Sequence, residues 1–144
     1  MASGLYGVTF LNALNNSLAI DLDDTTADRF KVMLVTSAYT PDFGTHDFKA
    51  DVTNEVSGTG YTAGGESLTS VTLTQSAGVI TWDAADVTWA SSTITARGAV
   101  VYDDSLTNDP LLCYIDFGAD KTSSLGDFAV AFNASGVFTL DLTP

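Results

Sequence analysis

The sequence is short of cysteine and of basic side chains, and each shortage excludes a class of protein. Its 144 residues include one cysteine, Cys113, so no disulfide can form within the chain. A length near 150 residues supports one hydrophobic core without such a link. Five Lys and Arg against eighteen Asp and Glu give a formal net charge of -13. This charge repels nucleic-acid phosphates and anionic lipids, so we expect no nucleic-acid and no membrane partner.

Long hydrophobic runs are also missing. No segment approaches the ~20 consecutive apolar residues that a membrane-spanning helix needs. The start of the chain, Met1 to Gly4, lacks the basic residues of a signal peptide. We therefore expect a protein that is synthesised in a cytoplasm.

Groups that carry nucleophilic catalysis are scarce. The only histidine is His46, and no G-x-S-x-G motif is present to pair a serine with it. Cys113 alternates with apolar residues on a predicted strand and has no basic neighbour in sequence, so we interpret it as a buried, unreactive thiol. We therefore expect a protein that is not an enzyme and that binds no cofactor.

Aspartate dominates the acidic residues, and turns are where aspartate ordinarily lies. Chance carboxylate pairs, such as Asp83 with Asp86, therefore give weak support for a glycosidase. The acids from Asp21 to Asp28 depart from the calcium-binding loop, which requires glycine and glutamate at fixed positions. A calcium site formed by Asp103, Asp104 and Asp109 stays open as an alternative, but we interpret them as solvated turn acids and predict no metal.

The composition favours strands over helices. Twenty threonines and thirteen serines accompany the aspartates; Asp and Ser disfavour helix interiors, and Thr suits a pleated strand. Period-2 alternation and turn signals predict strands at the following ranges: 18–22, 30–36, 68–75, 79–83, 86–89, 93–103, 111–117, 128–132 and 137–142. This spacing predicts an all-β protein with a single antiparallel β-sandwich, jelly-roll-like, over residues 17–144.

Several local features refine this prediction. Residues 1–16 read as a short helix or an apolar docking arm, because Phe10, Leu11 and Leu14 share one helical face. Residues 46–56 could hold a second short helix. Two Gly-containing turns, 76–78 and 133–136, predict hairpins, and the second would pair 128–132 with 137–142. Gly98 inside a long strand predicts a bulge or a close backbone approach.

The aromatic residues leave two interpretations open. Trp82, Trp89, Tyr61 and Tyr102 alternate with polar residues along strands, a pattern that favours core positions over a sugar-stacking platform.

We expect Arg97 to pair with an acid on its own face or across a subunit boundary.

Three stretches, in order along the chain, resemble a family of small virion structural proteins of tailed bacteriophages. They are DVTNEVSGTGYTAGG at 51–65, DAADVTW at 83–89 continuing to TITARGAVVYD at 93–103, and LLCYIDFG at 111–118. The similarity spans about residues 30–142. It implies a non-enzymatic, β-rich capsid decoration, or cement, protein on the exterior of the head.

The resemblance also directs expectations about partners. We expect binding to the major capsid protein and assembly into a homo-oligomer, specifically a trimer, because cyclic assembly accumulates small identical contacts. The candidate interface residues are Leu5, Phe10, Leu11, Leu14, Tyr61 and Arg97. The alternative function is a tail or fibre module that presents Trp82, Trp89 or Tyr61 to a host glycan.

Overall fold

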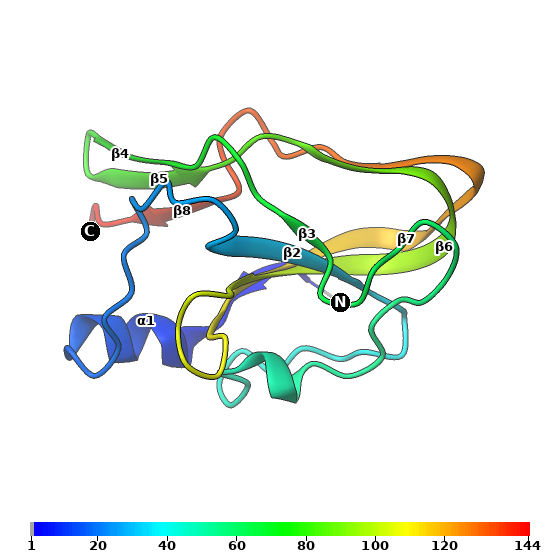
Figure 1. Cartoon of the computed structure of the whole chain (residues 1–144). Coiled ribbons are helices and arrows are strands. Elements are labelled where there is room, and N and C mark those ends of the chain that lie inside the picture. Colours follow the sequence, from blue (N-terminus) through cyan, green and yellow to red (C-terminus); the bar gives the residue numbers. More distant parts are fainter. Residues whose placement is uncertain (1) are drawn as a thin grey trace.

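A computed structural model describes residues 2–144 as two antiparallel sheets with one short helix (Figure 1). The five-stranded sheet has the order β1 (Gly4–Leu5), β7 (Leu111–Val130), β6 (Val87–Asp103), β2 (Phe30–Val35) and β3 (Glu66–Ser67). The three-stranded sheet has the order β4 (Thr72–Ser76), β5 (Val79–Asp83) and β8 (Phe138–Asp141). Helix α1 is Gly7–Leu14, and Lys49–Asp51 is a single 3-10 turn. The predicted all-β, sandwich-like fold is confirmed.

The long strands β6 and β7 connect the two layers. They pair with each other from Val87 and Val130 at one end to Tyr102 and Leu111 at the other. Their pairing register shifts at four places along this length, and Ser91 and Leu125 have positive φ angles of 51° and 52°. Such bulges bend a strand and increase its twist. The ribbon of two strands therefore folds back on itself, as the curve opposite β4, β5 and β8 in Figure 1 shows.

The five-stranded sheet is covered on both faces. Val32 and Leu34 of β2 belong to a cluster that includes both tryptophans, whereas Met33 and Val35 belong to a second cluster around buried tyrosines. All four side chains are at most 2% exposed. The strand predicted at 30–36 is β2, which lies between β6 and β3 in the sheet.

The N-terminal segment belongs to this body. Strand β1 pairs with β7, and the fully buried Tyr6 shares a 2.8 Å hydrogen bond with the hydroxyl of Tyr39. On α1, the Thr9 hydroxyl donates to the carbonyl of Leu111 at 2.5 Å. The helix lies within the predicted 1–16 stretch, and these contacts anchor it to the five-stranded sheet.

Two strand predictions are wrong. Residues 18–22 alternate in hydropathy but form no strand, although Ile20 and Leu22 still pack against the core. Turn 133–136 is tight, with a bridge between Asn133 and Gly136, but it does not pair the segments around it. Instead β8 pairs with β5, in a register that places Phe138 opposite Trp82 and Asp141 opposite Val79. The 76–78 hairpin joins β4 to β5 and is confirmed.

Other boundaries merge or shrink. The predicted strands at 86–89 and 93–103 are parts of β6, and those at 111–117 and 128–132 are parts of β7. Of the possible helix at 46–56, only the turn Lys49–Asp51 forms. Bulged strands keep their ladder partners through irregular stretches, so alternation that breaks in the sequence need not end a strand.

Gly98 is a position where only glycine fits. A Cβ atom there would lie 2.5 Å from the ring of Tyr114 on the neighbouring strand, which covers Gly98. The β6–β7 register also shifts between Ala96 and Gly98. The predicted bulge and close approach are both present.

Candidate functional site

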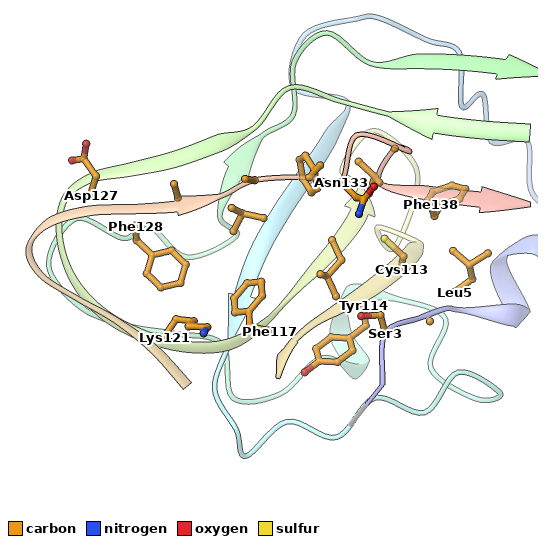
Figure 2. Close-up of a pocket in the computed structure, with 18 of the residues that line it drawn as sticks. Ser3, Leu5, Cys113, Tyr114, Phe117, Lys121, Asp127, Phe128, Asn133 and Phe138 are labelled. Atoms are coloured by element: carbon orange, nitrogen blue, oxygen red, sulfur yellow. The ribbon is translucent and has the colours of Figure 1, made fainter. Parts of the chain in front are cut away.

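An apolar cleft of about 710 Å³ lies inside the bend of β7 (Figure 2). One wall comes from β7 residues 113–117 with β1, and the other comes from residues 127–133 of the same strand and its continuation. The side chains that give the cleft its apolar character come from both walls and from β8: Leu5, Ile115, Phe117, Phe128, Val130, Phe132, Val137 and Phe138. We call this feature the β7 cleft.

The rings at the bent end of the β7 cleft face each other across it. Phe117 and Phe128 have their centroids 6.2 Å apart, and Figure 2 shows them on opposite walls. Lys121 is exposed near the bend, and the carboxylate of Asp127 points away from the cavity. Charge therefore stays at the rim, and the interior presents hydrocarbon to solvent. Apolar concavities of this size are typical of binding sites.

Cys113 lies on the inner wall of the cleft and is 3% exposed. Burial raises the pKa of its thiol to about 12, so the thiol stays protonated at neutral pH. A protonated thiol is a poor nucleophile. The prediction that Cys113 is buried is confirmed.

Helix α1 carries a second apolar feature close to the cleft. Leu11 is 61% exposed and Leu14 is 88% exposed, while Phe10 packs edge-on against Phe138 at 5.6 Å. The first twenty residues of the chain contain no charged side chain, although the whole chain carries a net charge of -13. The exposed helix face is thus an uncharged apolar projection on an acidic body.

The six candidate interface residues fall into three groups. Leu11 and Leu14 are exposed, as a contact surface requires, whereas Leu5 and Phe10 pack partly against the core. Tyr61 and Arg97 have partners inside the chain. The structure therefore places two of the six fully on the surface.

Tyr61 and Arg97 stabilise the fold locally. The Tyr61 hydroxyl accepts from the backbone N–H of Leu34 at 2.9 Å and donates to Glu55 Oε1 at 2.8 Å, and its burial raises its pKa. Arg97 donates to Asp116 Oδ1 on the adjacent strand at 2.8 Å. This hydrogen bond lowers the pKa of Asp116. Of the two expectations for Arg97, the pairing on its own sheet face is present.

The acids that suggested calcium are paired with basic side chains. Asp103 is fully buried, and its Oδ2 lies 3.2 Å from Arg29 Nη2. Asp104 pairs with Lys31 at 2.8 Å, and Lys49 lies 3.7 Å from Asp109. The interpretation as solvated turn acids is wrong for Asp103, which is buried at the end of β6, whereas Asp104 and Asp109 are partly exposed and pair with lysines.

Residues 2–144 contain no group of three or more His, Cys, Asp or Glu side chains arranged to hold a metal ion. His46 is engaged in structure: its Nδ1 lies 3.0 Å from the Tyr39 hydroxyl and its ring stacks on Tyr39. Over the same described residues, no helix is long and apolar enough to cross a membrane.

The tryptophans are core residues. Trp82 and Trp89 are 0% and 1% exposed, and the Trp82 indole N–H donates to the carbonyl of Leu22. Tyr102 is also fully buried. The core interpretation is confirmed for these three residues. Both tryptophans offered for glycan stacking are enclosed, whereas Tyr61 is partly exposed.

Comparisons with models of protein families, with curated proteins and with solved structures found no match for the chain.

The β7 cleft is the feature that sequence reasoning missed. Its walls come mainly from the two halves of one bent strand. Two features of the sequence could have indicated it: Gly118, and the broken alternation of exposed residues from 118 to 126 between two apolar segments. These residues form the bend that brings Phe117 opposite Phe128.

Proposed function

We propose that this chain is a structural protein of a tailed-bacteriophage virion, most specifically a non-enzymatic decoration, or cement, protein on the exterior of the head. In this role it binds the major capsid protein and assembles as a homotrimer. The observation that carries the proposal is the uncharged, exposed apolar face of α1 on a body of net charge -13. An adhesive patch on an acidic surface suits a subunit that must associate with neighbouring subunits of a particle at one place and stay soluble elsewhere.

The stretches that resemble the phage family support a scaffolding role, because they form one physical unit. The first stretch folds over the sheet that the other two build. Glu55 Oε1 accepts from the Gly64 N–H at 2.6 Å, and the Tyr102 hydroxyl donates to the Gly64 carbonyl at 2.7 Å. Thr59 forms a bridge with Thr93 on β6, which in turn pairs with β7. The residues of the motifs are thus used to shape a rigid fold.

Glycines in the same unit serve backbone contact. A Cβ on Gly65 would overlap the carbonyl oxygen of Val32, and the φ angle of Gly65 is 77°, which favours glycine. A similar close approach occurs at Gly58, where a Cβ would lie 2.5 Å from the carbonyl oxygen of Thr93. Such residues hold the loop of 51–65 flat against the sheet, as a rigid protein of a particle requires.

The tail or fibre alternative has weaker support. It needs exposed rings to stack on a sugar, and the two tryptophans that were offered for this purpose are enclosed in the core. We therefore place the decoration role first.

The experiment is addition of the purified protein to phage heads that lack it. We expect saturable co-sedimentation at a fixed ratio to the major capsid protein, together with a higher melting temperature of the heads. Heads that already carry the protein are the control and should take up none. Failure to co-sediment with the deficient heads contradicts the proposal, as does glycan-array binding by the isolated protein.

A further inference from the structure

The β7 cleft and the exposed face of α1 are two apolar features of one chain, and each lacks a covering. The cleft leaves Phe117, Phe132 and Val137 only half-buried. The helix leaves Leu11 and Leu14 mostly exposed. Exposed apolar surface of this kind marks contact sites in soluble proteins.

The helix cannot fill the cleft of its own chain. Phe10 already packs on Phe138, which closes one end of the cleft, and Figure 2 shows α1 beside that end. Leu14 lies one helical turn after Phe10 and is 88% exposed, so it projects beyond the body. The projection and the cavity therefore occupy different places on the surface, and only another molecule can bring them together.

Charge decides which occupant the cleft accepts. A charged side chain placed among the phenylalanines would be buried without a partner, which is costly. Two copies of a chain with a net charge of -13 also repel each other wherever acidic surfaces meet. Residues 1–20 form the longest stretch without charge, and α1 is its exposed part. The helix is thus the surface that a second copy can bring to the cleft without adding like charge.

The dimensions agree with such a contact. Stacked β-layers lie roughly 10 Å apart, which admits side chains between them but leaves no room for a helix, whose diameter is about 10–12 Å. Helix α1 has eight residues and is about 12 Å long. Its backbone would rest across the mouth while two leucine side chains enter the cavity of about 710 Å³.

We propose that Leu11 and Leu14 of one copy insert into the β7 cleft of a second copy. The contact joins two different surfaces, so it is head-to-tail, and repeating it closes a ring when the rotation allows. The proposal rests on the homo-oligomer part of the proposed function and identifies its interface. It does not depend on binding to the capsid.

The test uses variants that remove one surface at a time. Leu11→Gln with Leu14→Gln polarises the projection and keeps a good helix former at both positions. Phe117→Gln polarises the cleft, and Phe132→Gln is a second, independent cleft variant in case the first fails to fold. Leu125→Gln changes a leucine that is 84% exposed on the bend and serves as the matched control. Circular dichroism and thermal melting establish that each variant is folded.

Sedimentation equilibrium then gives the mass of each protein. We expect the wild type and Leu125→Gln near three times the chain mass of 15.1 kDa. Each leucine removed from the contact should weaken association at least roughly tenfold, so the helix variant and the cleft variants are monomers. A mixture of helix variant and cleft variant retains one intact surface on each molecule and should form a 1:1 heterodimer.

Each contrary result overturns the inference. A wild type that is monomeric at its highest soluble concentration removes both the inference and the homotrimer from the proposed function. An oligomer that survives in the folded helix and cleft variants removes the inference alone. A mixture that stays monomeric shows that the two surfaces do not meet. Failure to bind phage heads, in contrast, contradicts the virion role and leaves this contact intact.

Discussion

The ion pair between Asp103 and Arg29 is buried, so the loss of either partner should destabilise the fold. Asp103 is inaccessible to solvent, and its Oδ1 accepts from the N–H and the hydroxyl of Ser105 at 2.9 and 2.6 Å. Its Oδ2 lies 3.2 Å from Arg29 Nη2, and the Arg29 side chain is only 11% exposed. Removing one member of such a pair strands the other charge in a poorly solvated place, at a cost of about 3–5 kcal/mol.

We therefore expect Asp103→Asn to lower the free energy of unfolding by about 3 kcal/mol, at the lower end of that range, because Arg29 keeps its 2.7 Å contact with Asp24. For a domain of this length, such a loss lowers the melting temperature by roughly 6–12 °C. The matched control is Asp104→Asn, since Asp104 also pairs with a base but is 26% exposed. The control should cost less than about 1 kcal/mol.

Urea unfolding followed by tryptophan fluorescence measures both variants. The denaturant dependence should be unchanged, so that the shift in midpoint reports stability alone. Replacing the pair by apolar residues, Arg29→Met with Asp103→Leu, should recover part of the loss, because no buried charge is then left unpaired. Asp24 loses its contact with Arg29 but is 26% exposed. If Asp103→Asn costs no more than Asp104→Asn, the ion pair does not contribute in the way that its burial implies.

Three further predictions concern single positions. Gly98→Ala should lower the free energy of unfolding by about 1–3 kcal/mol, because the added Cβ clashes with the ring of Tyr114. Gly126→Ala should cost less, because a Cβ there meets nothing closer than 3.8 Å. Equal losses in urea unfolding would refute the close approach at Gly98. Arg97 holds the pKa of Asp116 below its usual range, so this pair contributes stability above a pH of about 3.9. That stability is lost as the pH falls through the lowered pKa that Asp116 has in the folded protein. Asp116→Asn should therefore flatten the decline of the melting temperature in acid. Cys113, with its thiol pKa of about 12, should react with a thiol reagent at neutral pH only at the rate of unfolding; fast labelling of the native protein would contradict its burial.

The helix substitutions proposed above should leave the free energy of unfolding nearly unchanged. Leu11 and Leu14 contribute little to the core, so Leu11→Gln with Leu14→Gln should change the free energy of unfolding by no more than about 0.5 kcal/mol per site. A large loss, measured by thermal melting, would mean that these leucines pack within their own chain.

Prediction from sequence succeeded where the signal is local. The alternation of β5 and the glycine turn before it identified the β4–β5 hairpin, and the strand predicted at 30–36 is present as β2. Cys113 and the two tryptophans were assigned to the interior from their apolar or alternating neighbours, and all three are buried.

It failed where the partner of a strand or a charge is distant in sequence. Alternation places Phe138 and Leu140 on one face but does not say whether β8 pairs with β7 or with β5, and the structure selects β5. Asp103 and Arg29 are 74 residues apart, so a chain of turn acids gave no sign that one of them is buried beside a base.

The residue types and their periodicity by themselves determined that this protein is built of strands, because strand propensity and period-2 burial act over a few neighbouring residues. Only the tertiary structure decided that β7 bends and brings Phe117 opposite Phe128, so that an apolar cleft forms beside the uncharged helix. A bend depends on bulges in a ladder with another strand, and the energy of that ladder comes from contacts that the local sequence does not contain.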